Sequence, residues 1–332
     1  MARILLSAPH NRPWSVGQYL LKALRDLGHE TEVFDYRNAV DLPAELEHHV
    51  QAHEPEIHIL FNGEKFRPAD IEWLKARGIY TILWNHDVHE SLPEWLIALA
   101  RVHDFYFNIA RGMIPRYREL GIENCAWLSE GFDPSFFQYE SISPEERRAY
   151  DTDAVLVGNI SNNPSYRIRR DMLAHLHRGG IRIQWWGTRI PHKWRNVTFF
   201  FTKVARSWGG EYIWNEKYAK VVACSKIFVA REINPEVEAS VSNRIYAALG
   251  NGAFYLSWYN PGMEDIFEID REIVVFRDLD EMVDKARYYL EHEDERLAIV
   301  KAGQARVLRD YSWRQRFEEM FQVVRSRSEV TV

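Results

Sequence analysis

Short apolar runs alternate with amphipathic stretches along the first 130 residues of the chain. The apolar runs have the length and the β-branched or aromatic content of buried strands, and they lie at 3–7, 30–34, 57–61, 81–84 and 105–108. Between them, apolar residues recur with helical spacing at 16–27, 68–76 and 93–100. Because strands separated by helices pair in parallel through right-handed crossovers, this part predicts a doubly wound, Rossmann-like sheet.

The same alternation begins again after a polar segment. Residues 131–150 open with Gly131-Phe132-Asp133-Pro134 and continue as a polar, proline-containing run with little helical pattern, so we predict that they link two domains. Beyond them, the pattern predicts strands at 154–157, 182–186, 227–230, 253–256 and 273–275. Helices are expected at 167–177, 212–222 and 243–249, and three more close the chain from about residue 280.

The sequence therefore predicts an α/β protein with two Rossmann-like, doubly wound domains. The first spans 1–130, the second spans 151–310, and a helix at 311–332 is expected to cross back to the first domain. Ligands of doubly wound folds bind at the carboxyl ends of the strands, so the two domains are expected to face a central cleft.

Composition narrows the class of protein. Hydrophobic residues make up 46% of the chain and charged residues 27%, which favours ordered domains with full cores. The two cysteines, Cys125 and Cys224, are too few for a disulfide framework, and no apolar run is long enough to span a membrane. These features argue against secreted, disulfide-stapled and transmembrane proteins and predict a cytoplasmic one. The aromatic content of 14% favours clefts that bind flat rings, such as sugars or bases.

Charge is distributed unevenly along the chain. The net charge of −6 argues against a protein that coats nucleic acid through bulk charge. Residues 161–210, however, hold ten Lys or Arg and a single acid, Asp171, so an anionic partner is expected near them. Aromatic rings alternate with these cations, for example at Trp194, Trp208 and 199–201. A nucleic acid, a lipid-phosphate surface or a partner protein could use this pattern, and an ordinary solvated surface over a few core rings is the alternative.

Familiar motifs of nucleotide and hydrolase sites are absent. There is no G-x-G-x-x-G after the first strand, no G-x-x-x-x-G-K-[ST], no G-x-S-x-G and no H-E-x-x-H. Asp151 and Asp153 form a D-x-D pair of the kind that holds a divalent metal with a nucleotide diphosphate, as do Asp278 and Asp280. Such pairs lie at the exit of a strand, whereas Asp151 and Asp153 precede theirs, so no metal site is predicted.

The turn after the strand at 154–157 has the composition of a phosphate site. Gly158 and Asn159 follow this strand, and Arg167, Arg169 and Arg170 begin the next helix. A small residue lets backbone N–H groups approach a phosphate, and arginines add bidentate charge. A plain turn followed by a solvated basic helix is the alternative.

A second candidate precedes the helix at 243–249. Ser242 is the predicted N-cap of this helix, and Asn243 and Arg244 lie in its first turn. Donors at a helix N-terminus can bind a phosphate or a nucleoside.

This part of the chain resembles a known family. The run Ser242-Asn243-Arg244-Ile245-Tyr246-Ala247, followed by Gly252-Ala253-Phe254-Tyr255-Leu256, is similar to the donor-binding helix and strand of GT-B glycosyltransferases, in particular their CgeB-like branch. Residues 261–267, 272–278, 286–290 and 311–316 resemble the segments that follow it in that family, and Gly131-Phe132-Asp133 and 153–158 resemble those that precede it. The resemblance extends from about residue 126 to 324.

The resemblance implies a hexosyl transferase of the EC 2.4 class. Such an enzyme would move a sugar from a nucleotide-diphosphate-sugar, most simply a UDP-sugar, to an acceptor hydroxyl without a metal or another cofactor. The acceptor, which would enter from the N-terminal domain, stays open: a glycan, a protein, a lipid phosphate or a modified nucleic acid. The donor site implied by the resemblance consists of Gly158, Asn159, Arg167, Arg170, Ser242, Asn243, Arg244 and Tyr246, with the sugar facing Glu238.

One position departs from the family pattern. Retaining GT-B enzymes commonly carry Glu-x7-Glu, in which the second glutamate binds the ribose hydroxyls of the donor. Here the first position is Glu238 and the second is Tyr246. A phenol can hydrogen-bond or stack, but it cannot offer two acceptor oxygens to a diol. A non-catalytic GT-B relative that acts as a binding or assembly protein is therefore an alternative.

Polar residues also follow strands of the N-terminal domain. His86 and Asp87 come directly after the strand at 81–84, and either could act as a general base or contact the sugar. The family has a Trp-x-x-Asp arrangement here, which Trp84 and Asp87 match, and a capped helix start is the alternative reading. The loop after the first strand adds His10 and Trp14 as acceptor-side candidates. A nucleic-acid or membrane-surface protein that uses 161–210 is the third hypothesis, and peripheral membrane contact is compatible with the first.

Overall fold

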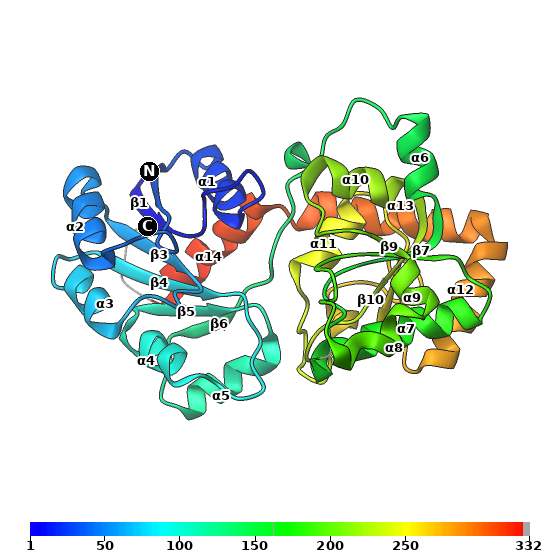
Figure 1. Ribbon diagram of the computed structural model, residues 1–332. Helices are drawn as coiled ribbons and strands as arrows, with labels where there is room; N and C mark the ends of the chain where they lie inside the picture. The colour runs from blue at the N-terminus through cyan, green and yellow to red at the C-terminus, as the bar shows by residue number, and fades with distance from the viewer. Residues whose placement is uncertain (162, 328–332) are drawn as a thin grey trace. The chain divides into compact units, whose positions relative to one another are not determined.

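The computed structural model describes residues 1–161 and 163–327, which form two compact units (Figure 1). The N-terminal unit comprises Met1–Gly131, Val237–Ser242 and the chain from Tyr311 onward, and the C-terminal unit comprises Phe132–Glu236 and Asn243–Asp310. Each unit contains one parallel six-stranded sheet between helices, so the predicted pair of doubly wound domains is confirmed. Within these described ranges, no helix has both the length and the apolar composition needed to cross a bilayer.

The sheet of the N-terminal unit has the strand order β2-β1-β3-β4-β5-β6. Winding therefore reverses between β1 and β3, which is the switch point of this sheet. The strands are β1 (Arg3–Ser7), β2 (Glu30–Phe34), β3 (Ile57–Phe61), β4 (Tyr80–Asn85), β5 (Phe105–Asn108) and β6 (Cys125–Trp127). The helices are α1 (Val16–Asp26), α2 (Leu42–His53), α3 (Pro68–Lys75), α4 (Glu94–Val102), α5 (Ile114–Glu119) and α14 (Trp313–Arg327).

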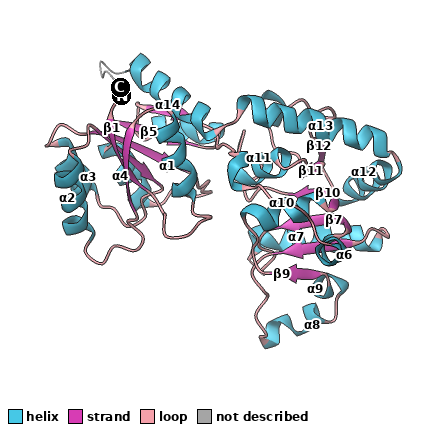
Figure 2. Ribbon diagram, turned by 90° about the horizontal axis from the view of Figure 1, so that it is seen from above, coloured by secondary structure: helices cyan, strands magenta, loops and turns pink. Residues whose placement is uncertain are grey.

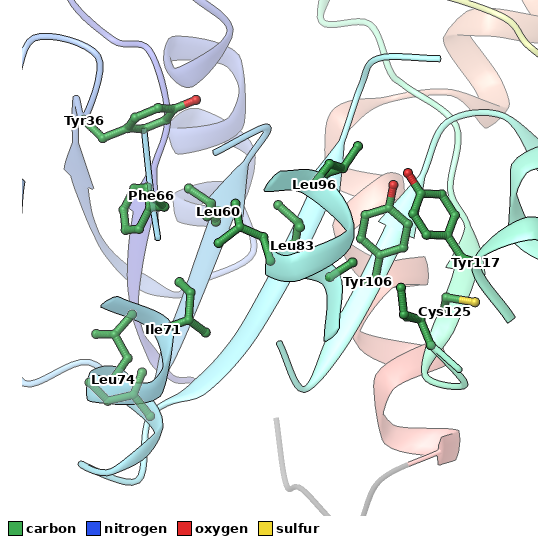
Figure 3. Close-up of a cluster of buried hydrophobic side chains, with 14 of the residues drawn as sticks. Tyr36, Leu60, Phe66, Ile71, Leu74, Leu83, Leu96, Tyr106, Tyr117 and Cys125 are labelled. Carbon is green, nitrogen blue, oxygen red and sulfur yellow. The ribbon is translucent and has the colours of Figure 1, made fainter. Parts of the chain in front are cut away.

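Side-chain alternation along the strands divides the core of this unit into two layers. In β1, Ile4 and Leu6 pack with α1 and α14, whereas Leu5 packs on the opposite face with α2 to α5. Figure 3 shows Leu60 and Leu83, from adjacent strands, directed to this second face. Both faces of a parallel sheet are covered by helices, which explains why these strands read as uninterrupted apolar runs.

Two segments remote in sequence complete the N-terminal unit. Helix α14 lies beside α1 (Figure 1) and buries Phe317 and Met320 against the sheet. Gly131 permits this arrangement, because a methyl group at its Cα would lie 2.8 Å from the backbone nitrogen of Trp313. The segment Val237–Ser242 joins the unit through a hydrogen bond from the backbone N–H of Gly112 to the carbonyl of Glu238, at 2.9 Å.

The sheet of the C-terminal unit has the order β12-β11-β10-β7-β8-β9, with a switch point between β7 and β10 (Figure 2). Its strands are β7 (Thr152–Val157), β8 (Ile183–Trp186), β9 (Trp208–Gly210), β10 (Ser225–Ala230), β11 (Tyr255–Trp258) and β12 (Val274–Phe276). The helices are α6 (Pro144–Tyr150), α7 (Pro164–Arg178), α8 (Val197–Phe200), α9 (Lys203–Arg206), α10 (Asn215–Ala223), α11 (Asn243–Gly250), α12 (Leu279–Glu291) and α13 (Glu293–Asp310).

The structure corrects several predicted boundaries. The segment expected to be poor in helix contains α6, which a capping box stabilises: the Ser143 hydroxyl accepts from the N–H of Glu146, and the Glu146 carboxylate accepts from the N–H of Ser143. Helix α7 begins at Pro164, three residues before the predicted start, since proline suits the first turn of a helix. As a result, Arg169 and Arg170 lie in its second turn. Helix α10 begins at Asn215 rather than at residue 212.

Two buried histidines make the stability of the N-terminal unit depend on pH. Burial lowers the pKa of His58 to about 3 and that of His103 to about 4, from an ordinary value of 6.5. The unfolded chain binds these protons near pH 6.5 and the folded unit does not. Stability is therefore complete above pH 6.5 and should fall as the pH drops toward 4, by about 1.4 kcal/mol per pH unit for each histidine. Urea unfolding between pH 7 and 5 should show this slope. The substitution His103→Gln should reduce it, and a change of the exposed His48 to Gln should not.

Candidate functional site

Side chains from four elements meet at the switch point of the C-terminal sheet. Strand β7 ends at Val157 and is followed by Gly158, while its neighbour β10 ends at Ala230 and is followed by Arg231 and Glu232. Helix α7 directs Arg169 to this point, and α11 directs Arg244 to it. A methyl group on Gly158 would lie 3.3 Å from Nη1 of Arg169 and 3.8 Å from Nη2 of Arg244. Both guanidinium groups therefore flank the backbone of Gly158.

Backbone carbonyls hold both guanidinium groups in place. Arg169, which is 3% exposed, donates from Nη2 to the carbonyl of Arg231 at 2.7 Å and from Nη1 to the carbonyl of Asn159 at 3.3 Å. Arg244 donates from Nε to the carbonyl of Val157 at 3.2 Å, and 21% of its side chain is exposed. Since these carbonyls belong to the two strand ends, the sheet itself positions both cations.

Positive charge exceeds negative charge at this point. The buried Glu232 carboxylate lies 3.8 Å from Nη1 of Arg244. Burial and the neighbouring Arg244 lower the pKa of Arg169 to about 10. Burial acts in the same direction on Arg244, but Glu232 and the nearby phenols of Tyr255, Tyr218 and Tyr212 together outweigh it, and the pKa of Arg244 is raised. Two guanidinium groups share one carboxylate, so an anionic ligand would relieve their mutual repulsion.

An aromatic pair stands next to these cations. Tyr212 and Trp214 are stacked, with their ring centroids 5.9 Å apart, and both are partly exposed. Burial raises the pKa of Tyr212 while Arg244 and Arg169 lower it, so its phenol is within electrostatic reach of both guanidinium groups. Such a pair offers a flat apolar surface to a ring. Tyr212 and Trp214 follow β9 in a loop that matches no motif, and the sequence analysis did not select them.

The two arginines of α7 that were selected from the sequence, Arg167 and Arg170, do not lie beside Gly158. Arg170 donates from Nη2 to the carbonyl of Ile160 at 2.9 Å, and its guanidinium carbon lies 4.5 Å from the centroid of the Phe199 ring. Arg167 is exposed. Helical rotation explains the difference, since neighbouring positions of a helix point about 100° apart. Arg170 was predicted to lie beside Gly158, and in the structure Arg169 lies there instead.

The residues around the start of α11 differ in exposure. The hydroxyl of Ser242 is buried and, among the described residues, has no hydrogen-bond partner, so the predicted N-cap bond is not formed. Asn243 is half-buried. Tyr246 is fully buried, with its ring centroid 6.1 Å from that of Phe267.

Asn159, in the turn after β7, caps its own loop: its side chain accepts from the N–H of Ser161 at 2.8 Å. Donor roles for Asn159, Ser242, Asn243 and Tyr246 stay predictions.

The N-terminal unit holds a histidine–carboxylate pair at the ends of β4 and β6. Nδ1 of His86 lies 2.7 Å from Oε1 of Glu130, and both side chains are more than 90% buried. The imidazole packs against Phe61 and Trp84, with centroids 3.8 Å and 4.5 Å away. A carboxylate at Nδ1 fixes the tautomer, and Nε2 of His86 is buried with no partner among the described residues. Glu130 was not among the selected residues, because a glutamate after a short strand matches no motif.

Asp87 and the loop after β1 are more exposed to solvent than the His86–Glu130 pair. Asp87 is exposed and accepts from Nδ2 of Asn62 at 3.3 Å. The backbone of His10 is held by Asp35, whose carboxylate accepts from its N–H at 2.9 Å. Trp14 is 37% exposed. An acceptor-side role for Asp87, His10 and Trp14 stays a prediction.

Glu238 is paired within the N-terminal unit. Its carboxylate accepts from Arg111 at 2.6 Å, and half of the Glu238 side chain is exposed. Ala239 follows with a φ of 49°, a strained value for a residue with a side chain. An exposed ion pair of this kind contributes little to stability, so Glu238 can exchange its partner for a ligand.

The D-x-D pair at 151–153 is occupied by arginine. Arg182 donates to Asp151 at 2.7 Å and to Asp153 at 3.0 Å, and Asp278 caps α12. In the described ranges 1–161 and 163–327, no group of three or more His, Cys, Asp or Glu side chains is arranged to hold a metal ion.

Comparison with known proteins supports the resemblance to glycosyltransferases over part of the chain. A family model described as glycosyl transferase-like matches residues 167–322. The matched region contains Arg169, Glu232 and Arg244, and the resemblance to glycosyltransferases inferred from the sequence is thereby confirmed. Comparison with curated proteins finds no significant match.

Solved glycosyltransferase structures share the fold over the whole chain. HepE from Anabaena, in complex with UDP and glucose, is 12% identical with a TM-score of 0.68, covering 98% of this chain and 100% of that one. The catalytic domain of starch synthase IV from Arabidopsis thaliana, bound to ADP and acarbose, is 11% identical with a TM-score of 0.70, covering 98% and 99%. AviGT4, a glycosyltransferase involved in avilamycin A biosynthesis, is 14% identical with a TM-score of 0.63, covering 98% and 97%. The fold is therefore GT-B.

Proposed function

We propose that this glycosyltransferase-family protein transfers a sugar from a UDP-sugar to an acceptor hydroxyl. The observation that carries the proposal is the pair of guanidinium groups beside Gly158, at the switch point of the C-terminal sheet. Arg169 and Arg244 are preorganised by backbone carbonyls, and the carboxylate of Glu232 lies 3.8 Å from Arg244. A diphosphate would supply the missing negative charge.

This arrangement suits the departure of a nucleoside diphosphate. In the transfer, the bond between the anomeric carbon and the diphosphate oxygen breaks, and the oxygen takes the electron pair. The acceptor oxygen bonds to that carbon while its proton passes to a general base, for which His86 and Asp87 are the candidates. Negative charge grows on the diphosphate as the bond breaks. Guanidinium groups fixed before the reaction stabilise that charge without reorganising, which accelerates the step. Tyr212 and Trp214 would receive the base of the nucleotide.

The choice of uridine rests on relatives. HepE structures contain UDP or UDP-glucose, whereas the starch synthase structure contains ADP. We assign the acceptor side to the N-terminal unit. There the carboxylate of Glu130 contacts Nδ1 of His86, and the neighbouring Asp87 is exposed. We further propose that the transferred sugar is a hexose and that the reaction needs no metal. The acceptor is to be identified by experiment.

Thermal unfolding with nucleotides tests the donor. UDP and UDP-glucose at about 100 times their dissociation constant should stabilise the C-terminal unit by about 2.7 kcal/mol, which raises its unfolding temperature by several degrees. ADP and GDP should shift it less, and added magnesium should leave the UDP shift unchanged. Unfolding curves that no nucleotide moves would contradict the proposal and favour a non-catalytic relative. Release of UDP from UDP-glucose on addition of candidate acceptors would then identify the second substrate.

A further inference from the structure

The segment between β8 and β9, residues 187–207, forms a helical insertion in the C-terminal unit. It contains a short 3-10 turn, Trp194–Asn196, followed by α8 and α9. Figure 2 shows α8 and α9 beyond the edge strand β9, at the outer end of this unit. Buried side chains anchor the insertion: Ile190, Phe199 and Val204 are each no more than 5% exposed and belong to the core of the unit. The insertion is therefore packed in place on its inner side.

Its outer side is also apolar. Trp194 is 90% exposed, Phe201 is 78% exposed and Val197 is 50% exposed. Their spacing of three and four residues places them on one face of the helical turns, opposite the buried Phe199. A short helix that already buries one apolar face gains nothing in the folded monomer from a second one. Clustered exposed aromatic side chains of this kind mark an interaction surface.

The charged residues of the insertion itself are all basic. Residues 187–207 contain five Lys or Arg and no Asp or Glu, although the whole chain carries a net charge of −6. The side chains of Arg189, Lys193, Lys203 and Arg206 are exposed. The surface is therefore complementary to a partner that is both anionic and apolar.

We propose that the insertion docks the protein on an anionic lipid bilayer. Trp194, Val197 and Phe201 enter the boundary between head groups and acyl chains, and the surrounding cations contact lipid phosphates. Trp and Phe on one face with Lys and Arg around them are the composition of interfacial helices. A nucleic acid suits the surface less well, because aliphatic Val197 offers a base nothing to stack on and the remainder of the chain is acidic. The proposal is independent of the proposed donor site.

Vesicle co-sedimentation of the full chain tests the proposal. The protein should bind vesicles of phosphatidylcholine mixed with phosphatidylglycerol and not vesicles of phosphatidylcholine alone, and salt should weaken the binding. Trp194→Ala and Phe201→Ala should each lower the partition coefficient roughly tenfold. Lys203→Gln and Arg206→Gln should each lower it about fivefold. Matched controls are Trp95→Ala, at a tryptophan 37% exposed on α4, and Arg271→Gln, with a side chain 74% exposed; neither should change it.

Because the substituted side chains are exposed, all variants should unfold at the wild-type temperature and bind UDP as the wild type does. Four results would overturn the proposal. Three of them are equal binding to neutral and anionic vesicles, vesicle binding that Trp194→Ala and Phe201→Ala leave intact, and tight binding to single-stranded DNA by a protein that ignores vesicles. The fourth is a dimer in solution that Trp194→Ala dissociates, which would assign the face to self-association.

Discussion

Replacing Arg244 by alanine is expected to lower kcat/KM for a UDP-sugar by about 10²–10³-fold, the usual cost of removing one preorganised donor from a developing charge. The guanidinium of Arg244 lies beside Gly158, where we place the diphosphate, and the carbonyl of Val157 fixes its orientation. Arg244→Lys should recover only part of the loss, because an ammonium cannot make the bidentate contact. Steady-state kinetics and UDP titration measure both effects.

Loss of folding must be separated from loss of binding in this experiment. Removing Arg244 takes away the guanidinium that lies 3.8 Å from the carboxylate of Glu232, a residue that is 4% exposed, and leaves Arg169 as a cation near it; breaking a buried pair costs up to about 3–5 kcal/mol. The double variant Glu232→Gln with Arg244→Gln removes that charge, so it should fold and still fail to turn over the donor. Arg271→Ala, at a 74% exposed arginine on the same unit, is the matched control and should be fully active. Wild-type kinetics in a folded Arg244→Ala variant would show that the donor lies elsewhere.

Gly303→Ala in α13 is expected to destabilise the C-terminal unit by about 3 kcal/mol. Helix propensity alone predicts the opposite sign, since alanine is better than glycine inside a helix by about 1 kcal/mol. A methyl group at Gly303, however, would lie 2.4 Å from the carbonyl oxygen of Glu272 and 2.9 Å from Cδ2 of Leu249. The backbone carbonyl cannot rotate away, so the whole helix would have to move, and the steric cost exceeds the gain in propensity.

Urea unfolding of Gly303→Ala measures this balance. Lys301→Ala is the matched control, because Lys301 is exposed on the same helix and its replacement should change stability by less than about 0.5 kcal/mol. A stabilised Gly303→Ala variant would mean that α13 shifts without cost and that the close packing against Glu272 is not required.

Most of the fold could be predicted from the order of apolar runs. The strands at 3–7, 30–34, 57–61 and 105–108 were predicted with the bounds that the structure shows, because buried parallel strands are short, apolar and separated by helices. Helix α6 was missed, since its stability comes from the capping box at Ser143 and from Pro144 rather than from an apolar stripe. The strand order could not be predicted either. The sequence predicts two doubly wound sheets, but it does not show between which strands each sheet reverses its winding.

The candidate site was only partly predictable. Gly158 and Arg244, which the structure places side by side, were both selected, through a turn signal and a resemblance to the donor helix of a family. Arg169 was passed over for Arg170, because the choice depends on the rotation of α7, which begins three residues earlier than the periodicity indicates. Glu232 and Glu130 could not be found at all. Each is a single acid at a strand end, and its importance comes from a cation or a histidine at a distance in sequence.

The fold class, the resemblance to a glycosyltransferase family and the concentration of positive charge and aromatic rings between 161 and 210 could all be recognised from the sequence. These are properties of local pattern and composition, so neighbouring residues are sufficient to specify them. Only the tertiary structure decided which side chains share a site. Arg169 meets the carbonyl of Arg231 across 62 residues, and Arg244 meets that of Val157 across 87. Such contacts depend on which strand ends become neighbours in the sheet and on how each helix is rotated, and both follow from packing the entire core.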